Sequence, residues 1–280
     1  MLQVGPYSVQ VVVAAVAALV AWRVPLLWRG VDGAGRRRAA GFVLDALLVG
    51  LLVARIAYVL RWWPDYLAAP WSMAAIGDGG FYPWIGLPAA LAFLYWRTRT
   101  MPELRRPALA GVGAGMGAWV AGRLVLMALA GAAPSLPALS LATLDGQPAA
   151  LSAQVGRPVV LNLWATWCPP CRREMPVLAR AAREHTDVTF LMVNQGETPE
   201  TIRAFLAGQA LDFEHVLVDP LSASMQALGT RGLPSTFFFG ADGRMVDSHF
   251  GELTDARLRD LVQRRFQPVP SLHPPTRRTP

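Results

Sequence analysis

Residues 160–176 read VLNLWATWCPPCRREMP, an apolar run followed directly by two cysteines that two prolines separate. The run from Pro158 to Ala165 is apolar and β-branched and has the length of a buried strand. The segment from Pro170 to Glu184 has helical spacing, with Pro176 as an internal kink. The strand therefore turns into a helix at Cys168. Free N–H groups and the helix dipole favour a thiolate at this position, which suits an exposed nucleophile.

The two thiols have the spacing that two-step thiol–disulfide exchange needs. Cys171 lies one helical turn after Cys168 and can attack the mixed disulfide that Cys168 forms, which releases the product. The chain has two cysteines, which excludes a disulfide-stapled scaffold, and a closed zinc site would need two more ligands from four scattered His. We therefore expect no metal and no cofactor. A structural disulfide and half of an intermolecular metal site remain as alternatives.

The two prolines between the thiols predict the direction of exchange. Pro169 and Pro170 have no N–H, so two potential donors to the Cys168 thiolate are missing, which leaves mainly the Cys171 amide and the dipole. A thiolate that is stabilised less favours the disulfide form, and the dithiol is then the better reductant.

Alternating strand and helix signals surround this motif and predict an α/β domain over 137–266. After a hairpin near 139–151 we expect strands at 158–165, 188–194, 215–218, 235–239 and 245–250, and helices at 170–184, 199–207, 221–228 and 255–266. Residues 134–136 are expected to form a Pro-containing linker. Residues 267–280 hold five Pro and no periodic pattern and are expected to be a disordered tail.

The stretch 160–176 and the later segment Gly232-Leu233-Pro234-Ser235-Thr236 closely resemble the TlpA/ResA/CcmG-type thioredoxins. The resemblance covers about 137–266 and implies a thioredoxin-like fold in a membrane-anchored, extracytoplasmic protein-disulfide reductase. It places Pro234 against the cysteine pair, with a cis peptide bond after Leu233 and with substrate pairing at Leu233. Trp167, Pro169 and Pro170 are the further candidates for contact with substrate.

The same resemblance assigns the proton-handling group. Asn162 stands where ordinary thioredoxins have a buried Asp, and Glu174 occupies the position from which a Glu of the TlpA/ResA type serves the second thiol. Glu174 is therefore the candidate acid/base for Cys171, and a solvated helical Glu beside Arg173 is the alternative. Glu197 also lies in a loop that resembles the family.

The first 133 residues differ in character from the rest and predict an all-α membrane domain. The chain is 53% hydrophobic and 16% charged, its mean hydropathy is +0.33, and all of its basic residues are Arg. Four apolar segments, at 7–28, 41–60, 81–96 and 108–133, predict about four transmembrane helices. Arg clusters follow the first and third segments, so both of these loops should face the cytoplasm and both chain ends should lie outside. This topology fits a multi-pass protein of the bacterial inner membrane with a periplasm-facing C-terminal domain.

Two Arg residues inside the apolar segments, Arg55 and Arg123, invite a functional interpretation. Pairing of Arg55 with Asp45, or snorkelling near a helix end, is the simpler alternative. Residues 54–60 and 79–86 resemble the early membrane part of prolipoprotein diacylglyceryl transferases, although that family has a His where this chain has Trp84. The resemblance implies a shared, degenerate membrane fold in which Arg55 and Arg123 bind an anionic lipid head group. Glycines at 111, 113, 115 and 117 predict close helix packing.

These features together predict a membrane-anchored thiol-disulfide oxidoreductase that reduces protein disulfides, in cytochrome c maturation or envelope redox homeostasis. The membrane half has no Cys, so a separate transmembrane electron donor of the DsbD or CcdA kind is implied. The alternatives are a lipid-dependent diacylglyceryl transferase-like activity of the membrane half and a redox-regulated holdase or assembly factor. The basic excess lies beside apolar runs, and the polar half is slightly acidic, which argues against nucleic-acid binding.

Overall fold

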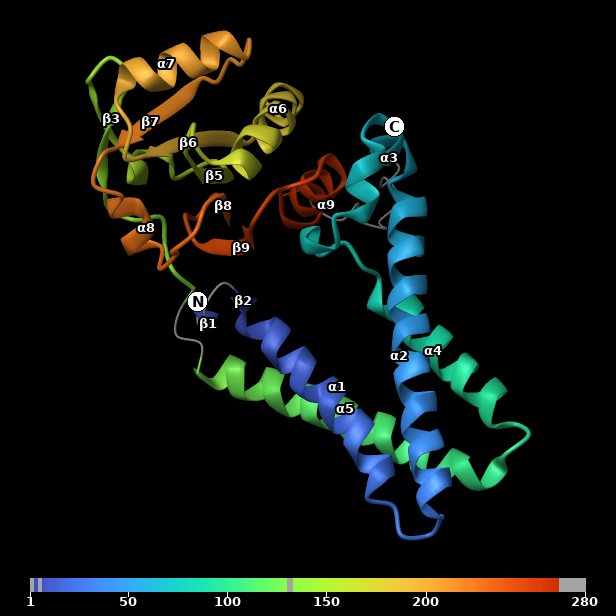
Figure 1. Ribbon diagram of the computed structural model, residues 1–280. Helices are drawn as coiled ribbons and strands as arrows, with labels where there is room; N and C mark the ends of the chain where they lie inside the picture. The colour runs from blue at the N-terminus through green and yellow to red at the C-terminus, as the bar shows by residue number, and fades with distance from the viewer. Residues whose placement is uncertain (1–2, 5–6, 130–132, 267–280) are drawn as a thin grey trace, which may run out of the picture. The chain divides into compact units, whose positions relative to one another are not determined.

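The computed structural model describes residues 3–4, 7–129 and 133–266 of the chain (Figure 1). The chain divides into two compact units, Met1–Met73 with Gly79–Ala132, and Ala74–Asp78 with Ala133–Pro280. The first unit is mostly helical and the second is built around one mixed β-sheet. The prediction of a helical N-terminal region and a thioredoxin-like α/β region is confirmed at this level. The predicted tail at 267–280 lies outside the described residues.

Four helices of more than one or two turns make up most of the first unit. They are α1 (Val9–Leu26), α2 (Gly33–Arg61), α4 (Pro83–Thr98) and α5 (Pro102–Leu129). The short strands β1 (Gln3–Val4) and β2 (Tyr7–Ser8) precede α1 and pair antiparallel. Between α2 and α4 come α3 (Trp63–Ala68), η1 (Pro70–Ala74) and η2 (Ile76–Asp78).

Three of these helices, α1, α2 and α5, are long and apolar enough to cross a membrane. The fourth expected span, α4, has 16 residues, which at 1.5 Å per residue extends about 24 Å against a hydrocarbon core of about 30 Å. The prediction of four spans is therefore not confirmed. Pro83 begins α4 because its fixed φ and missing N–H suit the first helical position.

The start of α2 differs from the prediction by eight residues. The Asp32 side chain accepts a hydrogen bond of 2.7 Å from the Gly35 amide and so caps the helix ahead of the apolar run. The cluster Arg36, Arg37 and Arg38 consequently lies in the first turns of α2 and not in a loop. Hydropathy locates only the apolar part of a helix, whereas the cap residue decides where it begins.

Two of the four glycines in α5 confirm the predicted close packing. A Cβ at Gly111 would lie 2.5 Å from the Ala21 carbonyl oxygen, and one at Gly115 would lie 2.9 Å from the Ala17 carbonyl oxygen. These residues are four apart and share one face, against which α1 packs. A Cβ at Gly113 or Gly117 would have no atom of the described residues within 4 Å, so the prediction is not confirmed for this pair.

The second unit contains a seven-stranded sheet in the order β4-β3-β7-β6-β5-β8-β9. Its strands are β3 (Ser140–Thr143), β4 (Pro148–Ala150), β5 (Val159–Trp164), β6 (Thr189–Gln195), β7 (His215–Asp219), β8 (Ser235–Phe239) and β9 (Met245–Phe250). The neighbours β5, β6 and β7 run parallel, and β8 pairs antiparallel with β5. The short helix η3 (Leu151–Gln154) follows β4.

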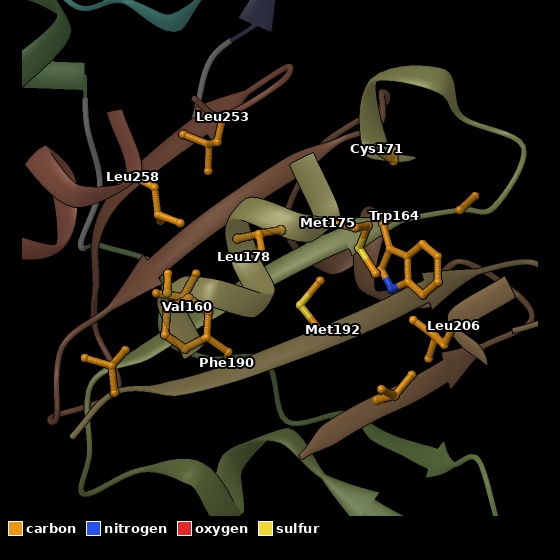
Figure 2. Close-up of a cluster of buried hydrophobic side chains, with 14 of the residues drawn as sticks. Val160, Trp164, Cys171, Met175, Leu178, Phe190, Met192, Leu206, Leu253 and Leu258 are labelled. Carbon is orange, nitrogen blue, oxygen red and sulfur yellow. The ribbon is translucent and has the colours of Figure 1, made fainter. Parts of the chain in front are cut away.

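The helices of this unit are α6 (Pro169–Glu184), α7 (Pro199–Gly208), α8 (Ala223–Ala227) and α9 (Asp255–Phe266). Alternate residues of the central strands enter two separate cores, one on each face of the sheet. Val160, Phe190 and Met192 pack with residues of α6, α7 and α9, as Figure 2 shows for the α6 residues Met175 and Leu178. The residues that come next in each of these strands point to the opposite face of the sheet, where they form the second core with residues of η3 and next to α8.

The residues expected to form a linker are joined to the sheet unit by backbone hydrogen bonds. The Leu136 amide donates to the Gly243 carbonyl at 2.8 Å, and the Met245 amide donates to the Pro134 carbonyl at 2.8 Å. Leu136 is also buried in the second core. Prolines in this segment indicate a break in helix, but they do not prevent its carbonyl groups from pairing with a strand edge.

Candidate functional site

The cysteine pair lies where the central strand β5 passes into α6. All six residues of β5 are buried, and the strand lies between β6 and β8, so its carboxyl end is fixed on both sides. Cys168 caps α6, with Pro169 and Pro170 at the first two helical positions. Pro169 is exposed and Pro170 is half-buried. The predicted strand-to-helix transition at Cys168 is confirmed.

The two cysteines form a disulfide with their Cα atoms 5.3 Å apart. The Cys168 Sγ accepts a hydrogen bond of 3.3 Å from the Cys171 amide. Cys168 is 3% exposed and Cys171 is fully buried, so the expectation of an exposed nucleophile does not hold for this disulfide form. The reason is that both sulfurs belong to the core beneath α6, where Figure 2 places Cys171 with Met175 and Trp164.

Glu174 is buried on the helix that carries the cysteine pair. It lies three residues after Cys171 on the same helix, and residues with this spacing share a helix face. Its Oε1 accepts from the Asn162 side chain at 2.7 Å, and its Oε2 accepts from the Leu253 amide at 2.9 Å. Burial raises the pKa of Glu174 to about 8, against the lowering effect of these two donors. The alternative of a solvated Glu beside Arg173 is wrong, because Arg173 pairs instead with Glu252 at 2.6 Å.

Asn162 links Glu174 to the strand that follows the predicted proline loop. The Asn162 Nδ2 donates both to Glu174 and to the Thr236 Oγ1, at 3.0 Å. Thr236 lies on β8, two residues after Pro234, and the expected cis peptide bond between Leu233 and Pro234 is present. An amide at position 162 can donate to a carboxylate, whereas a second carboxylate there would repel it.

Glu197 orients the chain just before the cysteines. Its Oε2 accepts from the Thr166 amide and from the Asn194 side chain, both at 2.7 Å, and its Oε1 accepts from the Thr166 hydroxyl. The sequence analysis assigned no definite role to Glu197. The contact could have been expected from the strand order, because Thr166 follows β5, Glu197 follows β6, and the carboxyl ends of these parallel strands meet at one edge of the sheet.

A surface groove of about 300 Å³ adjoins the site, and we call it the Trp167 groove. Trp167 is 67% exposed, and Leu233 comes from the cis-proline loop, so two of the four predicted substrate contacts line this groove. Its other side chains come from the end of β6 and from the segment around α8. The lining side chains are Trp167, Gln195, Ser222, Met225, Arg231 and Leu233.

The two candidate lipid-binding residues lie in the helical unit. Arg55, on α2, is 8% exposed and donates to the carbonyls of Gly80 at 3.0 Å, Met73 at 3.1 Å and Ser72 at 3.3 Å. These backbone acceptors take the place of the suggested Asp45 partner, which lies ten residues away on α2. Arg123 lies half-buried on α5. Among the described residues no cluster of His, Cys, Asp or Glu could hold a metal ion.

Comparison with known proteins covers the sheet unit. A family model described as Redoxin matches residues 130–262. The thiol-disulfide oxidoreductase ResA of Halalkalibacterium halodurans is 32% identical over 125 residues, which are 44% of this chain and 70% of that protein. The thioredoxin-like protein YneN of Bacillus subtilis is 31% identical over 132 residues, 45% of this chain and 75% of that protein.

Solved structures give similar partial matches. A secreted Mycobacterium tuberculosis disulfide oxidoreductase, described as homologous to E. coli DsbE, is 25% identical and has a TM-score of 0.42, covering 45% of this chain and 96% of that one. A structure of DsbF, also from the tubercle bacillus, is 27% identical with a TM-score of 0.43, covering 47% of this chain and 98% of that one.

Proposed function

The chain carries a Redoxin domain over residues 130–262 and belongs to the ResA-type thiol-disulfide oxidoreductases, and from this premise we propose that it reduces disulfides in client proteins outside the cytoplasm. The observation that carries the proposal is the cysteine pair at the start of α6, above a buried carboxyl whose pKa is near that of a thiol. The N-terminal helices are proposed to anchor the enzyme, since three of them are long and apolar enough to span a membrane.

The reaction transfers two electrons from the dithiol to the client. The Cys168 thiolate attacks one sulfur of the client disulfide, forms a mixed disulfide and expels the first client thiolate, which takes a proton. The Cys171 thiolate then attacks the Cys168 sulfur, breaks the mixed disulfide and expels the second client thiolate. The enzyme ends with the Cys168–Cys171 disulfide that the structure contains, and the client ends with two thiols.

Glu174 is proposed to move the proton of Cys171. A pKa of about 8 lies close to that of an ordinary thiol, about 8.5, so transfer between the two groups is nearly balanced in energy. Deprotonated Glu174 can accept the Cys171 proton as that thiol attacks. When the enzyme is reduced again, the same carboxyl can return the proton. Asn162 acts as a positioning residue, because its side chain donates to Glu174 and Thr236 and not to either sulfur.

The supply of electrons is proposed to come from a separate membrane protein. Cys168 and Cys171 are the whole thiol content of the chain, so the membrane helices have no thiols of their own to relay electrons across a bilayer. A transmembrane dithiol donor of the DsbD or CcdA kind would supply two electrons and two protons per cycle. The clients are then disulfide-bonded envelope proteins, of cytochrome c maturation or of general redox homeostasis. A lipid-binding role of Arg55 and Arg123 stays a prediction.

Trapping of the mixed disulfide tests the function. Full-length Cys171→Ser, reduced and mixed with a disulfide-bonded peptide, should accumulate a covalent adduct through Cys168, because no second thiol is present to release it. The adduct is read by mass spectrometry and should disappear with dithiothreitol. Cys168→Ser is the matched control and should form far less adduct. Equal adduct with both variants, or none with either, would contradict the assigned order of attack.

A further inference from the structure

The side-chain amide of Gln195 is held in one orientation beside the Trp167 groove. Gln195 ends β6, is 3% exposed and is one of the residues that line the groove. Its Nε2 donates to the Ser224 hydroxyl at 3.0 Å and to the Val193 carbonyl at 3.2 Å. A flipped amide would set the Gln195 oxygen against the Val193 carbonyl oxygen, where neither atom has a hydrogen to donate. Oε1 is therefore the free end of the amide.

A buried carboxylate fixes this orientation further. The Asp219 Oδ2 accepts from the Ser224 hydroxyl at 2.5 Å and from the Ser224 amide at 2.8 Å, and its Oδ1 accepts from the Ala223 amide at 2.9 Å. The Ser224 hydroxyl gives its one hydrogen to Asp219, so it can only accept from Gln195. Asp219 and Ser224 thus hold the Gln195 Nε2 as a donor, and the Gln195 oxygen is left as an acceptor.

The acceptor oxygen of Gln195 has no hydrogen-bond partner in the part of the chain that the structure describes. A buried acceptor without a partner has lost its hydrogen bonds to water and has no replacement for them, which costs free energy. Binding of a ligand that donates an N–H to this acceptor recovers part of that cost. Gln195 lines the Trp167 groove, but its oxygen has almost no accessible surface, so a client N–H can reach it only when the side chains around the groove move apart.

Arg231 adds a charge to the same groove. It is exposed, it lies on the loop that leads to Leu233, and it forms no ion pair with any residue that the structure describes. Trp167, Met225 and Leu233 supply apolar surface around it. The groove therefore combines apolar walls, one cation and one hydrogen-bond acceptor, which match a polypeptide segment that has N–H groups and a carboxylate.

We propose that the Trp167 groove selects acidic client segments, with Gln195 accepting an N–H of the client and Arg231 pairing with a carboxylate close to the attacked cysteine. The inference rests on the proposed oxidoreductase function and names the substrate class of that same site. The buried hydrogen bond to Gln195 increases the affinity for any client segment. The exposed charge of Arg231 makes the enzyme bind acidic segments better than basic ones.

Competition between two peptide disulfides tests the role of Arg231. The full-length reduced enzyme in detergent is offered two peptides that are identical except for Asp or Lys two positions from the cysteine. At low salt we expect a kcat/KM at least about threefold higher for the Asp peptide, with the preference falling as sodium chloride is added. Arg231→Gln should bring the ratio close to one, and Arg231→Lys should retain most of it.

Arg183→Gln is the control, because it removes the same charge from the last turn of α6, at the opposite end of that helix from Cys168, and should keep the wild-type ratio. A wild-type ratio near one, or an unchanged ratio in Arg231→Gln, would overturn the proposal. If the wild type reduces neither peptide, the oxidoreductase proposal fails and the client preference fails with it. The two failures are thus distinguishable.

Two variants of Gln195 test the acceptor. Gln195→Met removes the carbonyl oxygen at similar size, and it should raise KM for both peptides at least about fivefold while kcat changes less than twofold. Gln195→Glu keeps an oxygen acceptor but adds a negative charge, so the ratio should shift toward the Lys peptide even if overall activity falls. An unchanged KM in Gln195→Met together with an unchanged ratio in Gln195→Glu would contradict the assignment.

Discussion

At the scale of single residues, Glu174 shows how burial creates a functional group. A carboxyl in water titrates near pH 4.5, and removal from solvent beneath α6 raises this pKa to about 8 although two donors contact the carboxyl. The folded protein therefore holds a proton on Glu174 at neutral pH, where the unfolded chain does not. Any loss of that proton costs stability.

Glu174→Gln should abolish a specific loss of stability at alkaline pH. Because the folded state binds the proton more tightly than the unfolded state, stability falls as pH rises from about 4.5 through about 8. The full effect is about 5 kcal/mol as an upper limit. We expect hydrogen exchange of the oxidised protein to show protection of β5 amides that declines from pH 6.5 to 9 in the wild type and less so in the variant.

Comparison of variant with wild type at each pH removes the intrinsic pH dependence of exchange. His249 acts in the opposite sense, because burial lowers its pKa to about 4 and its contribution is lost as pH falls below about 6.5. Measurements above pH 6.5 therefore isolate the Glu174 contribution. Parallel profiles for the wild type and Glu174→Gln would show that the folded protein has already lost this proton below pH 6.5, which would contradict the near match between the pKa of Glu174 and that of the Cys171 thiol.

At the scale of the element, the first turn of α6 controls the reactive sulfur. A helix N-terminus offers free N–H groups, and a capping residue accepts from the amide of the second or third helical position. Pro170 occupies the second position and has no amide hydrogen, so the Cys168 sulfur accepts from the third, Cys171, alone within this turn. The sequence predicted the Cys171 donor correctly, but it counted Pro169 as a second lost donor, whereas the amide of the first helical position is not one that a cap accepts from.

Pro170→Ala should make the enzyme a weaker reductant. The variant restores one N–H directed at the Cys168 sulfur, which stabilises the thiolate and hence the reduced form. We expect the reduction potential to rise by about 30 mV or more, corresponding to one hydrogen bond to a charged group. Pro169→Ala is the matched control, since the first helical amide is not the one that a cap accepts from, and it should shift the potential much less. Equal shifts in both variants would contradict the argument.

The elements around the site were predictable to different degrees. The bounds of β8 and α9 match the expected 235–239 and 255–266, because an apolar run and an amphipathic pattern define them completely. The Asn162–Glu174 and Glu197–Thr166 contacts were not predictable from periodicity, since they join segments that only the sheet register brings together. The family resemblance identified Glu174 as a candidate. Gln195 was identified only in the structure, from its unpaired oxygen, because no motif in the sequence assigns it a role.

At the scale of the whole molecule, the number of membrane spans decides on which side of the membrane the cysteines lie. With three spans and an external N-terminus the sheet unit would be cytoplasmic, and with four it is external. The Arg residues on both sides of the α4–α5 connection favour four, so we propose that α4 crosses despite its 16 residues. Local thinning of the bilayer accommodates a short helix at modest cost.

Labelling of introduced cysteines tests this topology. In a background where both native cysteines are Ser, Leu221→Cys places a thiol at a position that is 83% exposed in the sheet unit, and Thr100→Cys places one between α4 and α5. A membrane-impermeant maleimide should label Leu221→Cys in right-side-out vesicles, and it should label Thr100→Cys only after detergent is added. The reverse pattern would place the sheet unit in the cytoplasm and contradict an envelope function.

The reduction potential of the Cys168–Cys171 pair distinguishes a protein-disulfide reductase from an oxidant. The full-length protein in detergent is equilibrated in glutathione or dithiothreitol buffers, and the fraction of disulfide is read by thiol alkylation. The missing proline amides predict a value near or below that of thioredoxin, about −270 mV, as a reductase requires. A value near −120 mV, typical of a strong disulfide donor, would contradict the account and identify the protein as an oxidant of its clients.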